Sequence, residues 1–177
     1  MTTSTTETVC PGCGLSMPAG PPGQVPPYDG YYNTSSECWA VCTEVLGEEF
    51  GNPVIFGQVH QLTVDSYAVQ HAGGRHPDKS IGIHLVGLHL VLERGLPPTR
   101  VPPVLQAMAK VIDTWPHFAP PEAPRTITVC DVALADSPAD HAAAVRRWAE
   151  TVWAAWGEHH DAVSRLVTQT LDLDEPE

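Results

Sequence analysis

The sequence is poor in basic residues and has no long apolar run, and each absence excludes a class of protein. Lys and Arg number 9 against 21 Asp and Glu, a formal net charge of −12 at pH 7. Affinity for nucleic acid comes from neutralised phosphates, so nucleic acid is not an expected partner. An anionic membrane would repel the chain for the same reason, and no stretch approaches the roughly 18 apolar residues of a membrane span.

Targeting and cofactor signatures are absent as well. Residues 1–8 have neither the basic start nor the apolar core of a signal peptide, so we expect a cytoplasmic protein. Thiols stay reduced in the cytoplasm, and the five cysteines are therefore expected to be metal ligands or buried thiols, not disulfides. The chain has no phosphate loop, nucleotide fingerprint, nucleophile elbow or His-Glu-x-x-His motif. The familiar cofactor classes thus have no support.

The 177 residues are enough for one domain with one core. The polar, Thr-rich residues 1–9 are expected to be a disordered tail and the acidic residues 172–177 a second tail. Between them, residues 10–171 are predicted to form a single helical domain. Its first part, residues 10–33, contains five prolines between positions 18 and 27 and is interpreted as an extended arm over the domain.

Cysteines at the start of this arm indicate a zinc site that would staple it to the domain. Cys10 and Cys13 form a Cys-x-x-Cys pair, which presents two thiolates to one tetrahedral zinc, while more distant segments supply the other ligands. Cys38 is the expected third ligand and His60 the fourth. Buried free thiols or a redox dithiol are the alternatives for the pair.

The fourth position has two other candidates. Cys42, one helical turn after Cys38, would complete a Cys₄ site, whereas His71 would complete a Cys₃His site. The sequence alone leaves these alternatives open.

Hydrophobic periodicity and capping signals predict an all-α fold, an irregular bundle of five or six helices with little or no strand. The first four expected helices run from a Thr34–Glu37 capping box to Phe50, from Pro53 to His71, from Ser80 to Arg94, and from Thr99 to about Trp115. A short helix is expected to be capped by Thr128 through Asp131. The last helix is expected to run from the N-cap Ser137 to about Leu171, with a possible kink at Gly157.

The helix 53–71 carries the most suggestive pattern. His60, Tyr67 and His71 stand at i, i+7 and i+11 on one stripe, and His84 lies in the middle of the next, almost wholly apolar helix. We predict Tyr67, His71 and His84 to be catalytic. Converging imidazoles could hold a metal with an open position for water, or His71 and Tyr67 could act as acid and base without metal. The alternative is that each is a hydrogen-bonded core residue.

Several motifs together resemble a known family. They are Cys-Pro-x-Cys-Gly, Tyr-x-Asn-x-Ser-x-Glu-Cys-Trp, Val-His-x-Leu-Thr-Val-Asp-x-Tyr-Ala-Val-Gln-His, Leu-Val-Leu-Glu-Arg-Gly-Leu and Trp-Ala-Glu-x-Val-Trp-x-Ala-Trp. From Cys10 to about His160 the chain is similar to the DUF5946 family of small, mostly actinobacterial proteins, for which no activity is implied. The resemblance marks as part of the family pattern Cys10, Cys13, Cys38, His60, Asp65, Tyr67, Gln70, His71 and His84, whereas Cys42 and His89 fall at apolar or variable positions.

Two functions follow as hypotheses. The first is a zinc-binding helical protein that acts as a small metal-dependent enzyme, using the His/Tyr pocket for hydrolysis or an allied step on a small molecule. The second is a non-catalytic zinc-stabilised module that binds a protein partner through an acidic surface or the helix carrying Trp148, Trp153 and Trp156. An exposed Trp face would also favour a homodimer. An enzyme requires at least two of the His/Tyr groups to face a water-reachable cavity.

Overall fold

The computed structural model describes residues 7–20, 28–122 and 127–171, and these residues form a helical fold with one small hairpin. The predicted all-α class is confirmed. The expectations for residues 1–6, for part of the Pro-rich arm (21–27) and for the acidic tail (172–177) lie outside the described residues. Seven α-helices occur in the described part, one or two more than expected: α1 (Ser36–Gly51), α2 (Pro53–Gln70), α3 (Asp78–Leu92), α4 (Val101–Val111), α5 (Val129–Ala133), α6 (Pro138–Ala155) and α7 (His160–Leu171).

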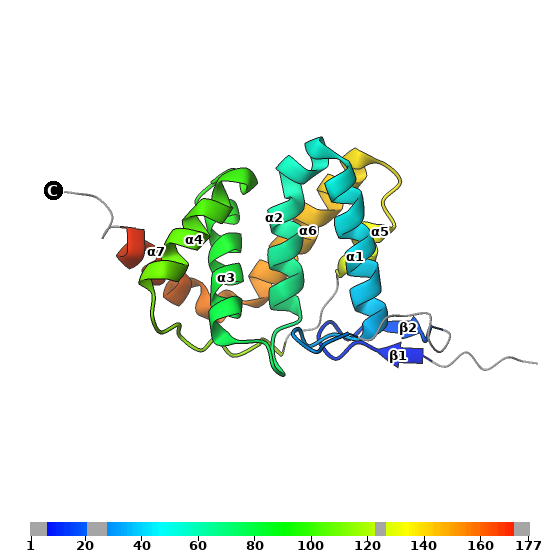
Figure 1. Cartoon of the computed structure of the whole chain (residues 1–177), viewed down its shortest axis with the longest axis horizontal. Coiled ribbons are helices and arrows are strands. Elements are labelled where there is room, and N and C mark those ends of the chain that lie inside the picture. Colours follow the sequence, from blue (N-terminus) through cyan, green and yellow to red (C-terminus); the bar gives the residue numbers. More distant parts are fainter. Residues whose placement is uncertain (1–6, 21–27, 123–126, 172–177) are drawn as a thin grey trace, which may run out of the picture.

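Helix α2 is the centre of the molecule. It packs against α1, α3 and α6, and also against the 3₁₀ helix η1 (Pro98–Arg100). Figure 1 shows α2 between α1 and α3, with α6 crossing behind it. The helix begins where predicted, because Asn52 accepts hydrogen bonds from the backbone N–H groups of Val54 and Ile55, and Pro53 occupies the first turn. A helix covered on so many sides buries residues all round, which explains its apolar composition.

The hairpin is the part of the fold that differs most from expectation. Strand β1 (Glu7–Val9) pairs antiparallel with β2 (Ser16–Pro18), with Val9 opposite Ser16. The prediction of a disordered tail is therefore wrong for residues 7–9. The loop between the strands is closed by two backbone bonds, from Cys10 N to Leu15 O at 2.9 Å and from Gly14 N to Cys10 O at 2.8 Å. These bonds join the two short strands around the Cys-x-x-Cys pair.

Most helix starts follow the capping signals, with one shift. Thr128 and Asp131 form the predicted capping box of α5, and Ser137 caps α6. Helix α1 is capped by Ser35, which accepts from the backbone N–H of Cys38, and not by Thr34 as predicted. The hydroxyl of Thr34 is used elsewhere, close to the sulfur of Cys10.

One predicted helix ends earlier than its periodicity suggested, and another is interrupted at its predicted kink. Helix α4 stops at Val111, and the buried Trp115 beyond it covers α3 at Gly82, where a Cβ would lie only 3.0 Å from the indole Cζ3. The long C-terminal helix is broken at the expected Gly157, where the 3₁₀ helix η2 (Gly157–His159) separates α6 from α7.

The tryptophans of the α6 region belong to the core. Trp148, Trp153 and Trp156 are all buried. The indole N–H of Trp148 donates to Gln70 at 3.1 Å and that of Trp153 to Glu93 at 2.8 Å, so their polar atoms are satisfied internally. The hypothesis of an exposed Trp face for a partner or a homodimer is therefore contradicted.

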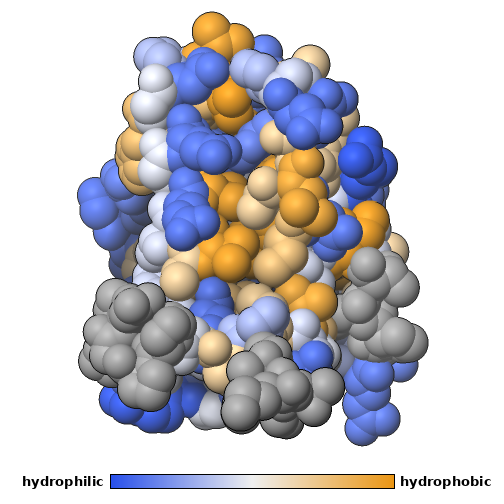
Figure 2. All heavy atoms as spheres, turned by 90° about the vertical axis from the view of Figure 1, so that its right-hand side faces the viewer, coloured by the Kyte–Doolittle hydropathy of each residue, from blue (hydrophilic) through white to orange (hydrophobic). Residues whose placement is uncertain are grey.

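Hydrophobic side chains do reach the surface in places, as Figure 2 shows for the side of α1, α5 and the hairpin. None of the helices in the described ranges has the length and apolar composition needed to cross a membrane.

Two glycines, one at the contact between α2 and α3 and one on an open face of α1, are predicted to respond in opposite directions to substitution by alanine. Gly87 lies against the buried carboxyl group of Asp65, and a Cβ there would meet Oδ2 and come within 2.7 Å of Cγ. Gly47, in α1, has nothing within 4 Å of an added Cβ. We expect Gly87→Ala to lower the free energy of unfolding by about 1–3 kcal/mol through overpacking. We expect Gly47→Ala to raise it by about 0.5–1 kcal/mol, because alanine loses less backbone entropy.

Urea unfolding followed by circular dichroism measures both changes. Equal effects of the two substitutions would contradict the close α2–α3 contact.

Candidate metal centre

Four metal-ligating side chains meet where the hairpin, α1 and α2 come together. Cys10 and Cys13 come from the hairpin loop, Cys38 from the first turn of α1, and His71 from the C-cap of α2. Their ligand atoms all lie within 4.8 Å of one another. The four residues are 0–3% exposed. The structure thus gathers a buried Cys₃His group that can hold a metal ion.

The imidazole is oriented toward the sulfur atoms by its own helix. His71 Nδ1 lies 2.8 Å from the carbonyl oxygen of Tyr67, one turn earlier. A carbonyl oxygen only accepts, so Nδ1 carries the proton and Nε2 offers its lone pair. Nε2 lies 3.4 Å from Cys38 Sγ, which is in turn 3.9 Å from Cys13 Sγ. This backbone contact fixes the tautomer that a ligating histidine requires.

Tyr67 supports the group from outside. Its hydroxyl donates to Cys38 Sγ at 3.7 Å and lies 2.8 Å from Thr34 Oγ1, which is 3.5 Å from Cys10 Sγ. Its ring stacks on that of His71, with 4.0 Å between centroids. Tyr67 is itself buried, so it covers the cysteine group and does not face water.

Charge in the group is shared among the four side chains. Hydrogen bonds from Cys13 and Cys38 hold the pKa of Cys10 far below its usual range. The bond to Cys10 raises the pKa of Cys13 to about 11, and the bonds to Cys10 and Cys13 raise that of Cys38. Burial opposes the charged form of His71, but contacts with Cys10 and Cys38 outweigh it and raise its pKa to about 9. Without metal the group therefore favours a Cys10 thiolate beside a protonated His71, and His71 Nε2 must release its proton before it can ligate a metal.

Gly12 allows the hairpin loop to approach the end of α2. A Cβ at Gly12 would meet the carbonyl oxygen of Asn33 and come within 2.5 Å of His71 Cδ2. The backbone N–H of Asn33 donates to His71 O at 2.9 Å. This bond holds the segment that precedes α1 against His71. Close packing therefore requires a glycine between the two cysteines.

His60, predicted as the fourth ligand, lies elsewhere. Its Nδ1 is 2.7 Å from Glu49 Oε2 on α1. Eleven residues separate His60 from His71, about 16 Å along a helix, so the two imidazoles cannot reach one ion. Cys42 is buried one turn beyond Cys38 and is not part of the four-ligand group.

The predicted catalytic set does not converge either. His84 Nδ1 lies 2.8 Å from Asp65 Oδ1, which also accepts from the amide of Gln61 at 2.8 Å. Burial raises the pKa of this fully enclosed Asp65 carboxyl group. His84 therefore sits on the α2–α3 contact, while Tyr67 and His71 belong to the metal centre.

Glu49 is the polar residue that the sequence reasoning missed. Its side chain is completely buried and contacts His60, Thr63 and His141. A signal for it exists in the sequence, because Glu49 continues the buried i, i+4, i+7 stripe of α1. That stripe consists of Cys38, Cys42, Val45 and Glu49.

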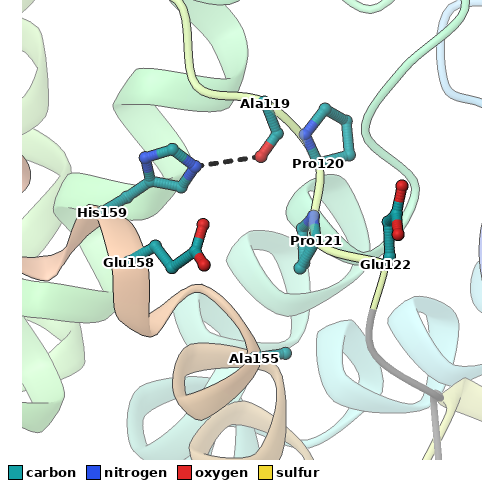
Figure 3. Close-up of a pocket in the computed structure, with 7 residues that line it drawn as sticks. All are labelled: Ala119, Pro120, Pro121, Glu122, Ala155, Glu158 and His159. Atoms are coloured by element: carbon teal, nitrogen blue, oxygen red, sulfur yellow. Dashed lines mark hydrogen bonds between the residues drawn. The ribbon is translucent and has the colours of Figure 1, made fainter.

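A surface pocket of about 540 Å³ lies away from these groups. It is lined by Ala119, Pro120, Pro121, Glu122, Ala155, Glu158 and His159 (Figure 3). None of these residues belongs to the predicted set. The ring of His159 bonds to the carbonyl oxygen of Ala119 at 3.0 Å, so its Nε2 is already engaged.

The close approach at Gly12 predicts that Gly12→Ala opens the cysteine group. The added methyl must displace the His71 ring or the Asn33 backbone, at a cost of about 1–3 kcal/mol. The rate at which dithiobisnitrobenzoate modifies the thiols should therefore rise. Gly14→Ala is the control: Gly14 has φ +74° but nothing within 4 Å of an added Cβ. It should cost about 1–2 kcal/mol of backbone strain and leave the thiols protected; similar thiol rates in both variants would contradict the packing argument.

Comparison with known families places the chain. The family model described as "Family of unknown function (DUF5946)" matches residues 8–157, a range that contains all four ligands and ends after α6. No match is found among curated proteins or among solved structures. Because the match covers well over half of the sequence and includes the motifs that suggested it, the chain belongs to the DUF5946 family.

Proposed function

We propose that this protein is a zinc-stabilised helical module, in which one structural Zn²⁺ at Cys10, Cys13, Cys38 and His71 holds the N-terminal hairpin against α1 and α2. The observation that carries the proposal is the convergence of four buried ligand side chains from three segments that are distant in sequence.

The ligand types and spacings favour zinc. Thiolates with one imidazole are a common structural zinc set. With Zn–S of ~2.3 Å and Zn–N of ~2.0 Å, a tetrahedron separates two sulfurs by ~3.8 Å and a sulfur from a nitrogen by ~3.5 Å. The distances of 3.9 Å between Cys13 and Cys38 and 3.4 Å between Cys38 and His71 match these edges. These two distances fit a tetrahedral zinc, and all four ligand atoms lie within 4.8 Å of one another.

Burial of all four ligands favours a structural over a catalytic role. A catalytic zinc keeps three protein ligands and an open position for water, whereas four protein ligands close the coordination sphere. Tyr67 and Thr34 cover the sulfur atoms. The geometry therefore supports the non-catalytic alternative at this centre, and gives no support there to metal-dependent hydrolysis.

The metal would supply stability that the hairpin lacks. Two three-residue strands are too short to be stable alone, so metal-binding free energy would become folding free energy for this part of the chain. With the tryptophans buried, the acidic surface is the feature left for a protein partner, and a net charge of −12 would favour a basic one.

Metal content tests the proposal directly. Elemental analysis of protein purified without added metal or an affinity tag should give one zinc per chain. Cys38→Ser and His71→Ala should lose it, because three ligands no longer close the site. His60→Ala and Cys130→Ser should keep it, since His60 bonds to Glu49 and Cys130 lies outside the ligand group.

Three results would overturn the assignment: no metal in the wild-type protein, zinc retained after His71→Ala, or zinc lost after His60→Ala. Circular dichroism of each variant distinguishes loss of metal from general unfolding, because the α2–α3–α6 core does not include the hairpin.

A further inference from the structure

A second polar group lies at the other end of α2. The buried carboxylate of Glu49 accepts hydrogen bonds from His60 Nδ1 at 2.7 Å, Thr63 Oγ1 at 2.5 Å and His141 Nε2 at 3.0 Å. These donors come from α2 and α6, and the acceptor from α1. Three donors satisfy the oxygen atoms of one fully desolvated carboxyl group. Glu49 is thus a buried acceptor that joins α1 to α2 and α6.

His60 connects this buried carboxyl group to the surface. Its side chain is 16% exposed, whereas that of Glu49 is 0% exposed. With Nδ1 turned to the buried carboxylate, the accessible part of the ring carries Nε2. Phe56 stacks on the ring at 4.3 Å between centroids, and Phe50 lies at 4.7 Å. The imidazole is held in one orientation by a carboxylate below it and aromatic rings beside it.

The accessible part of His60 lines a small pocket between α2 and η1. The pocket has a volume of about 140 Å³ and is lined by Phe56, His60, Gln61, Pro98, Thr99 and Pro102. Its walls are mostly apolar, with one amide and one hydroxyl group. Such a pocket suits a small uncharged molecule, and the acidic protein disfavours an anion.

His141 reaches a different pocket. This one, of about 360 Å³, lies between the end of α1 and the start of α6, and its lining includes Glu48, Asn52 and His141. His141 Nδ1 lies 3.8 Å from Glu48 Oε2 at its edge. The chain His60–Glu49–His141 therefore links two separate surface pockets through one buried carboxylate.

A carboxylate bonded to one imidazole nitrogen makes the other nitrogen a proton acceptor and stabilises the imidazolium that results. We propose that His60 is a catalytic general base acting on a small uncharged ester in the α2–η1 pocket, with Glu49 as its positioning residue. His60 Nε2 takes a proton from water as the water oxygen bonds to the acyl carbon. The acyl carbon–oxygen ester bond then breaks, and the departing oxygen receives that proton to leave an alcohol and an acid.

Two other carboxylate–imidazole pairs show why His60 is singled out. His84 is held by Asp65 at 2.8 Å, but it lines none of the described pockets. His117 is held by Asp78 at 2.7 Å, but its side chain is 69% exposed and that of Asp78 44%, so water screens the pair. Among these three pairs, the one at His60 alone combines a desolvated carboxylate with a pocket. His117 is therefore a matched control. His141 shares Glu49 and lines the larger pocket, but its other ring nitrogen, Nδ1, lies 3.8 Å from a second carboxylate, that of Glu48.

The first test uses p-nitrophenyl acetate as the probe and measures release of p-nitrophenolate by the full-length, zinc-replete protein. We expect His60→Gln to reduce the protein-dependent rate at least tenfold and His117→Gln to leave it unchanged. Glu49→Gln should lower kcat with little change in KM, because it disturbs the orientation of the base and not the pocket walls. Zinc content should be unaffected in all three variants, so this proposal and that of the structural zinc can fail independently.

A second measurement needs no variant. Diethyl pyrocarbonate transfers its ethoxycarbonyl group to neutral imidazole, with release of carbon dioxide and ethanol. Mass spectrometry should find His60 modified faster than the more exposed His117. The proposal is overturned if His60→Gln hydrolyses the ester like the wild type, or if His60 reacts more slowly than His117.

Discussion

The meeting of the hairpin cysteines with Cys38 and His71 is the contact on which the N-terminal third of the structure depends. It requires the first turn of α1 and the last turn of α2 to lie together, which the backbone bond from Asn33 to His71 also enforces. Nearby capping follows from it. Ser35 caps α1 because Thr34 points its hydroxyl at Cys10 and Tyr67. The two strands of the hairpin have only three residues each, and the Cys-x-x-Cys pair lies in the loop between them.

Helix α2 contributes residues to three polar groups, each with different surroundings. The C-terminal end of α2 supplies His71 to a closed group of thiols. Its middle supplies Asp65 to a buried pair with His84, and its N-terminal half supplies His60 to Glu49. The stripe seen in the sequence is real as a face of the helix, but the rise of a helix spreads its members over about 16 Å. Each imidazole therefore meets a different neighbour.

This spread marks the limit of what the sequence could predict. Period and capping signals located α2, α5 and the start of α6, because these depend on residues close together in the chain. Three of the four residues in the Cys₃His group were chosen by residue type and spacing. The fourth could not be, because choosing His71 over His60 depends on which end of α2 meets α1. The burial of Glu49 depends in the same way on α6 crossing behind two other helices.

The two ends of α2 are suited to different functions, metal binding at His71 and proton transfer at His60. A group of four buried protein ligands has no free position, so bound metal there can stabilise but has no place for a substrate. His60 is only partly enclosed, yet it stands on a helix that ends in the Cys₃His group on one side and at the Asn52 cap on the other. A catalytic side chain needs such a rigid base, since small displacements weaken proton transfer sharply. In this arrangement, the packing of α2 against α1, α3 and α6 is what holds His60 in position for chemistry, whether or not metal is bound at His71.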